Sequence, residues 1–222
     1  EGATLGIPCM TAHRSLFVAG PVQGRTVLVT GGAGAVGHYA VQLAKWAGAT
    51  VIATVSSGEK AQRALEGGAD HVIDYRQEKV AKRVRELTNG EGVHHVVDVD
   101  FGGNLATTLQ VVRVNGSVAF YATKGAREPA VPAGALMGLN LNVHGVLLPV
   151  SPHEARKRAQ QDVTRWISTG QRILSVAGRF AGPAHPFRTP MSSSPRRSPP
   201  RTWNGPPTRR PPLRNASPRN GS

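Results

Sequence analysis

The sequence predicts an α/β fold in which helices cover a doubly wound, parallel sheet of six strands. An apolar, β-branched run at residues 27–30 is followed by glycines and then by apolar residues at the spacing of one helix face. Further short apolar runs alternate along the chain with segments of helical periodicity. Strands that alternate with helices form right-handed βαβ units and a parallel sheet, so this order predicts the fold class.

The individual elements follow from the same patterns. We expect strands at residues 27–30, 51–54, 71–74, 93–99, 116–121 and 141–148. We expect helices at residues 11–16, 36–47, 59–66, 77–87, 104–112 and 153–169. Gly48, Gly67 and Gly170 stand where three of these helices would end. Because ligands of such sheets bind at the carboxyl ends of the strands, the loops that follow the strands form the candidate site.

The loop after the first strand carries the spacing Gly32-x-Gly34-x-x-Gly37. The first glycine permits a tight turn, the second lets the backbone approach a pyrophosphate, and the third lets helix and strand pack closely. The N–H groups at the start of the next helix would then face the phosphates. A glycine-rich turn without a ligand is the alternative. The flanking strand and helix, with a second strand after them, favour a dinucleotide site of the Rossmann type.

The end of the second strand bears on which dinucleotide binds. An NAD site usually carries Asp or Glu here, which accepts from the ribose hydroxyls. This chain has Ser56 and Ser57 instead, with Lys60 and Arg63 close behind. Hydroxyl groups and cations suit a 2′-phosphate, so the sequence favours NADP(H) over NAD(H). The alternative is that Lys60 and Arg63 only form the solvated face of the next helix.

The charge is distributed unevenly. A net charge of +14 on 222 residues first suggests a nucleic-acid partner or an anionic surface. Eight arginines and no acidic residue follow Phe180, however, which leaves +6 for the first 180 residues. Residues 181–222 also hold 11 of the 17 prolines and no periodic apolar pattern, so we expect a disordered tail there. It is either a basic arm that binds nucleic acid or, as we favour, the product of a shifted reading frame.

Other classes of protein and site find little support. No apolar run is long enough to cross a bilayer, and no signal-peptide pattern opens the chain. The single cysteine, Cys9, excludes an intramolecular disulfide and fits a cytoplasmic setting. His94 and His95 are neighbours on a strand and would point to opposite faces, so we expect no metal site. Asp98 ends this strand, where it would either bind a ribose or stabilise the next turn.

Several motifs, taken together and in order, resemble those of a known family. They are Ile7–His13, Val27–Gly37, Ala69–Tyr75, Val97-Asp98 and Gly102-Gly103. The combination resembles the medium-chain dehydrogenase/reductase superfamily over roughly residues 1–180. Within that superfamily the chain is most similar to the zinc-free quinone oxidoreductases, the zeta-crystallin-like branch. The resemblance implies a nucleotide-binding domain with the strand order 3-2-1-4-5-6.

The resemblance also implies the cofactor contacts. The pyrophosphate would be held by Gly32, Ala33, Gly34, Ala35 and Val36, and the 2′-phosphate by Ser56, Lys60 and Tyr75. Asn104 would line the adenine side of the crevice. The nicotinamide and its ribose would lie near Tyr121, Ala122, Thr123, Lys124, Val146, Leu147 and Leu148, and near Thr11 on the nicotinamide side. Because the cofactor carries the chemistry of hydride transfer, we expect no catalytic acid or base.

The same family has a substrate domain before this region and returns to it after the last helix. We therefore expect a truncated chain with a lead-in helix and linker at residues 1–24, a nucleotide-binding domain at 25–180 and the tail at 181–222. The implied function is NADPH-dependent hydride transfer to a small molecule, a quinone or an enone. Because catalysis depends on substrate positioning, an inactive dinucleotide binder is one alternative. A nucleic-acid-associated protein, which would bind through the basic tail, is another. The family also implies a homodimer through the sixth-strand edge, at residues 141–148, which could equally be an edge prone to aggregation.

Overall fold

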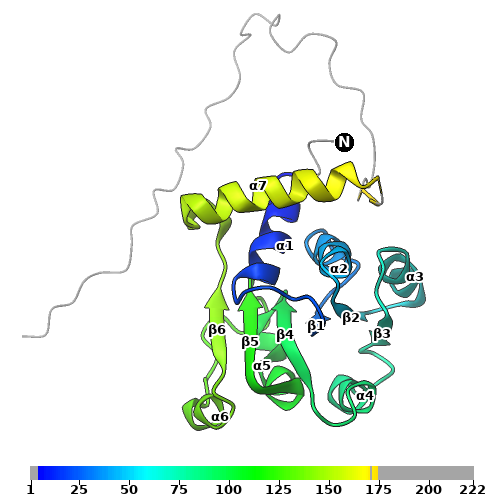
Figure 1. Ribbon diagram of the computed structural model, residues 1–222. Coiled ribbons are helices and arrows are strands. Elements are labelled where there is room, and N and C mark those ends of the chain that lie inside the picture. The colour runs from blue at the N-terminus through cyan, green and yellow to red at the C-terminus, as the bar shows by residue number, and fades with distance from the viewer. Residues whose placement is uncertain (1–4, 171, 175–222) are drawn as a thin grey trace, which may run out of the picture. The chain divides into compact units, whose positions relative to one another are not determined.

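The computed structural model describes residues 5–170 and 172–174, so the tail expected at residues 181–222 lies outside the described residues. Six parallel strands form one sheet in the order β3-β2-β1-β4-β5-β6, which confirms the predicted fold class (Figure 1). The strands are β1 (Thr26–Val29), β2 (Thr50–Val55), β3 (His71–Asp74), β4 (Val93–Asp98), β5 (Val112–Phe120) and β6 (Asn142–Gly145). The direction of winding reverses between β1 and β4, so the candidate site lies at the carboxyl ends of these two strands.

Helices cover both faces of this sheet (Figure 1). They are α1 (Ile7–Phe17), α2 (Gly37–Trp46), α3 (Gly58–Glu66), α4 (Val80–Leu87), α5 (Phe101–Val111), α6 (Ala133–Gly138) and α7 (His153–Ser168), with a 3-10 turn, η2, at Leu148–Val150. Residues of α1, α2, α3 and α7 share one buried apolar cluster with the sheet, and residues of α4 and α5 share the other. Val27 and Val29 of β1 belong to the first cluster and Leu28 to the second, because successive strand residues point to opposite faces. Among the described residues, no helix has both the length and the apolar character that a membrane span requires.

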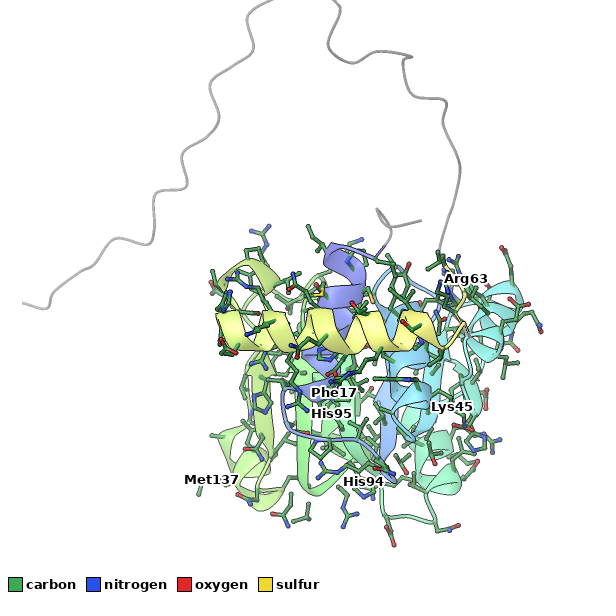
Figure 2. All side chains as sticks on the ribbon, turned by 45° about the horizontal axis from the view of Figure 1, so that its top comes forward. Phe17, Lys45, Arg63, His94, His95 and Met137 are labelled. Atoms are coloured by element: carbon green, nitrogen blue, oxygen red, sulfur yellow. The ribbon has the colours of Figure 1, made fainter. Side chains whose placement is uncertain are left out.

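A buried histidine fastens α1 to the sheet. His95 of β4, labelled in Figure 2, lies 2.7 Å from Ser117 Oγ of β5 through Nδ1, and 2.8 Å from the Ser15 carbonyl oxygen of α1 through Nε2. Since a carbonyl oxygen only accepts, Nε2 carries the proton. Burial lowers the pKa of His95 to about 4, so the ring is neutral at neutral pH. The neighbouring His94 takes another partner, accepting from the Thr26 N–H at 3.1 Å.

Several elements differ from the predicted bounds. The helix predicted from residue 77 begins only at Val80, because Asp74 holds the chain before it in a turn. The Asp74 carboxylate accepts from the Arg76 N–H and its carbonyl oxygen accepts from the Gln77 N–H, both at 3.0 Å. The strand predicted at residues 141–148 is shorter, since β6 ends at Gly145 and η2 follows. The short helix α6 was not predicted, because six residues are too few to show a helical period.

Candidate functional site

The loop between β1 and α2 makes a sharp turn at the carboxyl edge of the sheet. Gly31 has a φ angle of +66°, a backbone conformation that favours glycine. A Cβ atom on Gly37 would lie 2.2 Å from the Gly31 carbonyl oxygen, and one on Gly32 would lie 2.7 Å from the Cβ atom of Ala53. The first and third glycines of the fingerprint therefore allow the loop to pack directly against β2 and the start of α2.

The backbone N–H groups of this loop fall into two sets. Thr54 of β2 accepts from the Gly31 N–H through Oγ1 at 3.2 Å and from the Gly32 N–H through its carbonyl oxygen at 2.9 Å. The Gly34 N–H donates to the Gly31 carbonyl oxygen at 2.8 Å. No acceptor among the described residues serves the N–H groups of Ala33, Ala35, Val36 and Gly37. These four groups are the donors that remain for an anion at the start of α2.

Hydroxyl and ammonium groups meet where β2 ends. Lys60 Nζ donates to Ser56 Oγ at 2.8 Å, and Ser57 Oγ caps α3 by accepting from the Lys60 N–H at 3.4 Å. Ser56 is buried, whereas Lys60 is exposed. The Tyr75 N–H donates to the Val55 carbonyl oxygen at 3.1 Å, so Tyr75 lies next to the strand end that carries Ser56. The three residues predicted to surround a 2′-phosphate are thus gathered at one point of the sheet edge.

A cavity of about 740 Å³ opens at the point where the winding of the sheet reverses. Gly31, Tyr75 and Asn104 line it, together with Val99 and Asp100 from the loop after β4. The structure thus brings two predicted site residues, Tyr75 and Asn104, into one cavity with the start of the glycine loop.

Asp98, the last residue of β4, is the polar centre of this region. Its Oδ1 atom accepts from Thr30 Oγ1 at 2.8 Å, from Asn104 Nδ2 at 2.7 Å and from the Asp100 N–H at 3.0 Å. Thr30 Oγ1 also accepts from the Val99 N–H at 2.9 Å. Of the two roles that the sequence left open for Asp98, the structure shows the stabilisation of the following turn.

Asp100 ties the loop after β5 to the start of α5. Its carboxylate accepts from the Lys124 N–H at 2.7 Å, from the Gly125 N–H at 2.9 Å and from a third N–H group in the first turn of α5 at 3.3 Å. Hydrogen bonds from the backbone, that of Gly125 foremost, hold the pKa of Asp100 below its usual value, because they favour the charged form. The carboxylate therefore acts as a clamp on this loop as well as an N-cap.

The other predicted residues of this loop belong to the same clamp. The Phe101 N–H donates to the Ala122 carbonyl oxygen at 3.1 Å, and the Gly102 N–H donates to Thr123 Oγ1 at 3.3 Å. Tyr121 is partly buried. Burial, and then the charge of the carboxylate that ends β4, raise the pKa of the Tyr121 hydroxyl. The hydrogen bonds to Asp100, Phe101 and Gly102 fix the backbone of residues 121–124 at the carboxyl edge of the sheet.

The remaining predicted residues lie farther along this edge. The Val146 N–H donates to the Phe120 carbonyl oxygen at 2.8 Å, so the loop after β6 starts beside the end of β5. Val146 is buried, whereas the side chain of Leu147 is 63% exposed. Leu148 begins η2, which contacts α1, and Thr11 is buried within α1. Predicted residues from the two ends of the domain thus lie on elements that touch.

Three residues of this site were missed by the sequence patterns. Thr54 stands one residue before the end of β2, and Thr30 directly follows β1. Neither gives a local signal, because their partners come from other strands and loops. Asp100 carried a signal that could have been used. It stands immediately before the helix it caps, where Asp is favoured.

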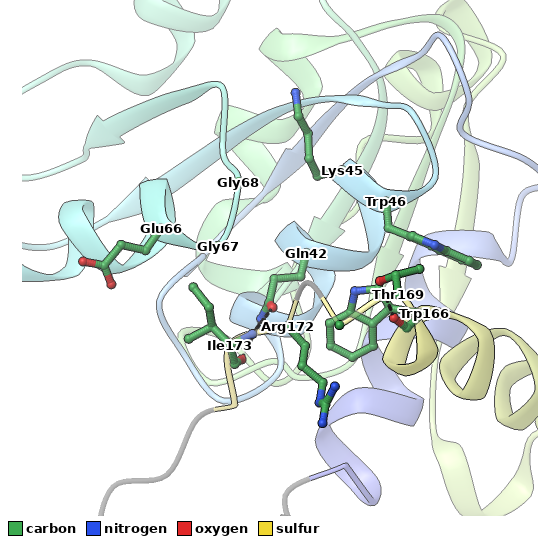
Figure 3. A pocket seen from close by; sticks show the side chains of 11 residues that line it. Gln42, Lys45, Trp46, Glu66, Gly67, Gly68, Trp166, Thr169, Arg172 and Ile173 are labelled. Carbon is green, nitrogen blue, oxygen red and sulfur yellow. Dashed lines mark hydrogen bonds between the residues drawn. The ribbon is translucent and has the colours of Figure 1, made fainter.

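A second cavity lies away from the glycine loop, between the C-terminal ends of α2, α3 and α7 (Figure 3). It measures about 480 Å³, and none of the predicted site residues lines it. Gln42 there accepts from the Ile173 N–H at 2.8 Å and donates to the Ile173 carbonyl oxygen at 3.0 Å (Figure 3). Within residues 5–170 and 172–174, no three His, Cys, Asp or Glu side chains are grouped as metal ligands.

The chain is similar in sequence to known proteins. Residues 35–168 match the family described as zinc-binding dehydrogenase. A 2-haloacrylate reductase from Burkholderia is 39% identical over 129 residues, which make up 57% of this chain and 39% of that protein.

Solved structures give the same result. A quinone oxidoreductase from Escherichia coli, complexed with NADPH, aligns with a TM-score of 0.71 and 28% identity over 79% of this chain and 55% of that one. The mycobacterial protein Rv1454c, also complexed with NADPH, aligns with a TM-score of 0.71 and 32% identity over 78% of this chain and 56% of that one. The chain thus spans about half the length, or less, of these relatives. As its motifs led us to expect, the chain belongs to the zinc-binding dehydrogenase family, within the medium-chain dehydrogenase/reductase superfamily.

Proposed function

We propose that this chain is the NADPH-binding part of an oxidoreductase that reduces a quinone or an enone. The observation that carries the proposal is a group of four N–H donors at the start of α2 that lack an acceptor among the described residues, those of Ala33, Ala35, Val36 and Gly37. A helix N-terminus with free N–H groups binds phosphate, because hydrogen bonds and the helix dipole act together. The relatives solved with NADPH support the choice of ligand.

The surroundings of this loop fit a dinucleotide. Gly32 and Gly37 stand where a Cβ atom would collide with β2 or with the loop itself, so the loop can keep this shape only with glycines there. The neighbouring cavity, about 740 Å³, falls within the usual range for pockets that bind small molecules and cofactors. We assign it to the adenosine half, with Tyr75 and Asn104 on its walls.

The end of β2 supports NADPH over NADH. A carboxylate that would accept from ribose hydroxyls, and repel a 2′-phosphate, is replaced here by Ser56. Lys60 bonds to Ser56 with one of its three N–H groups, which leaves two for a phosphate. The alternative, in which Lys60 only faces solvent, does not require this contact.

The chain's own residues would orient the cofactor. When bound, NADPH supplies the hydride, while the protein supplies binding, orientation and electrostatics. The start of α2 would hold the pyrophosphate, and the Asp100 clamp would fix the backbone of residues 121–124 beside the nicotinamide. Residues 146–148 and Thr11 would complete that side. We propose no general acid or base.

One observation favours a second candidate, an inactive dinucleotide binder. The proposed nicotinamide side is open, with Leu147 63% exposed and Val150 76% exposed, so the described residues do not enclose a substrate. Substrate positioning supplies a large part of catalysis. The third alternative, a nucleic-acid-associated protein, rests on residues 181–222, which lie outside the described residues.

Turnover by the full chain separates the two candidates. NADPH oxidation would be followed by loss of its absorbance in the presence of a series of quinones and enones. Oxidation that depends on the acceptor supports the enzyme. NADPH binding without turnover of any acceptor identifies the inactive binder, and failure to bind either nicotinamide dinucleotide would contradict both.

A further inference from the structure

The carboxyl group of Asp98 is fully buried, yet only one of its two oxygens has hydrogen-bond partners. Oδ1 accepts three hydrogen bonds, from Thr30, Asp100 and Asn104. Oδ2 is buried and has no partner among the described residues. A buried carboxyl group with an unpaired oxygen is costly for a fold, so its presence at the reversal point of the sheet calls for an explanation.

The three donors come from the segments that surround the proposed dinucleotide site. Thr30 directly precedes the glycine loop, Asp100 stands in the turn after β4, and Asn104 lies on α5 and lines the 740 Å³ cavity. They therefore meet at a single atom, Asp98 Oδ1. Loss of this atom as an acceptor would release all three segments together.

The contact with Asn104 also sets the chemistry of the cavity wall. Because Asn104 Nδ2 donates to Asp98, the amide presents its other polar atom, the carbonyl oxygen, elsewhere. No described residue donates to that oxygen. This oxygen therefore remains available to a ligand as an acceptor, which pairs with a hydroxyl or an amino group of an adenosine.

We infer that Asp98 is a positioning residue of the proposed dinucleotide site. It holds the start of the glycine loop through Thr30 and turns the acceptor oxygen of Asn104 toward the ligand. This inference rests on the proposed function, although its effect on the loop exists without any ligand. Asp98 itself is buried, so we assign it no direct contact with cofactor or substrate.

The test compares four variants of the full chain, with NADPH affinity measured by calorimetry and stability by thermal unfolding. We expect Asp98→Leu, which removes the acceptor at nearly constant side-chain size, to weaken NADPH binding about tenfold, which is about 1.4 kcal/mol. Thr30→Val, which removes only the hydroxyl, should weaken binding similarly, and Thr30→Ser should restore it. The double variant Asp98→Leu/Thr30→Val should lose little more than either single variant, because the two residues share one network.

A second hydrogen-bonded carboxyl group, that of Asp162, serves as the control. Asp162 of α7 bonds to His13 of α1 at 2.9 Å, outside the proposed site. We expect Asp162→Leu to lower stability without changing NADPH affinity. If Asp98→Leu behaves as this control does, the role of Asp98 is structural and the inference is wrong.

Amide hydrogen exchange on the ligand-free chain keeps the inference separate from the proposed function. Asp98→Leu should speed exchange at the N–H groups of Val99, Asp100 and Gly31, and leave α7 unchanged. Unchanged exchange at these three groups would overturn the inference. Faster exchange in a chain that binds no dinucleotide would retain the coupling of the segments and reject the proposed function alone.

Discussion

The two sides of the proposed crevice differ in how completely this chain builds them. The adenosine side comprises the loop at residues 31–37, Ser56, Lys60, Tyr75 and Asn104. It is held by Thr54, by Asp98 and by steric contacts at two glycines. The nicotinamide side comprises residues 121–124, residues 146–148 and Thr11. Asp100 clamps the first of these segments, residues 121–124. The second segment leaves the apolar side chain of Leu147 exposed.

This difference separates binding from chemistry. Every contact that we assign to the adenosine half comes from elements within the described domain. The open nicotinamide side is where a substrate would have to be positioned, and its exposed apolar groups are costly unless something covers them. The comparison therefore predicts that affinity resides mainly on the adenosine side. Four tests follow, from the largest expected effect to the smallest, and the second concerns the attachment of α1, which carries Thr11.

Gly37→Ala should have the largest effect. The new Cβ atom would lie 2.2 Å from the Gly31 carbonyl oxygen, so the loop must move. We expect NADPH affinity to fall by about a hundredfold and stability by roughly 3 kcal/mol. Calorimetry and thermal unfolding measure the two losses. Gly134→Ala in α6 is the matched control, because its Cβ atom would meet open space. Equal behaviour of the two variants would remove the steric argument for the fingerprint.

The tie between α1 and the sheet should depend on pH. Burial lowers the pKa of His95 to about 4, whereas the unfolded chain has the ordinary value of about 6.5. The unfolded state therefore binds more protons between these values, and stability should fall as pH drops from about 6.5 to about 4, by up to about 3 kcal/mol. Denaturant unfolding at several pH values would show it. His95→Gln should lose this component of the pH dependence, and an identical pH profile would contradict the assignment.

Lys60→Glu should discriminate between the two dinucleotides. A lysine that binds the 2′-phosphate contributes a charge-assisted hydrogen bond, so we expect NADPH affinity to fall roughly ten- to a hundredfold. NADH affinity should change by less than about threefold, since NADH has no phosphate there. Lys157→Glu on α7 makes the same charge change outside the site and should affect neither ligand. Equal losses for NADPH and NADH in Lys60→Glu would reject the 2′-phosphate assignment.

Leu147→Ser should have the smallest effect. The side chain is largely exposed, so we expect stability to change by no more than about 0.5 kcal/mol. NADPH affinity should fall only a few-fold. Affinity for a fragment that contains only adenosine and its phosphates should not change, because the fragment does not reach the nicotinamide side. Calorimetric titration with both ligands measures the difference. An equal loss of affinity for the fragment would contradict the placement of Leu147 on the nicotinamide side.

The sequence predicted the elements that are governed by short-range patterns. The β1–loop–α2 unit and β3 have such patterns, and the structure confirms both with small shifts at the ends. The predicted start of α4 was wrong, because the Asp74 turn competes with the helix for the backbone of residues 76 and 77. A helical period alone does not reveal that competition.

The sequence predicted the loop that carries the proposed donors, but not the hydrogen bonds that support this loop. The glycine spacing identified the loop, but only the structure separates the N–H groups that Thr54 occupies from those that are free. The network around Asp98 joins β1, β4 and α5, so its contacts depend on strand order and register. The residue identities at positions 30, 98 and 104 carry no local sign of that meeting.

Calorimetric titration of the full chain with NADPH, and separately with NADH, tests the central claim most directly. The account predicts tight binding of NADPH and much weaker binding of NADH. Equal binding of both would contradict the Ser56 and Lys60 assignment but keep the glycine loop. Binding of neither by a folded chain would contradict the claim that this domain holds a nicotinamide dinucleotide.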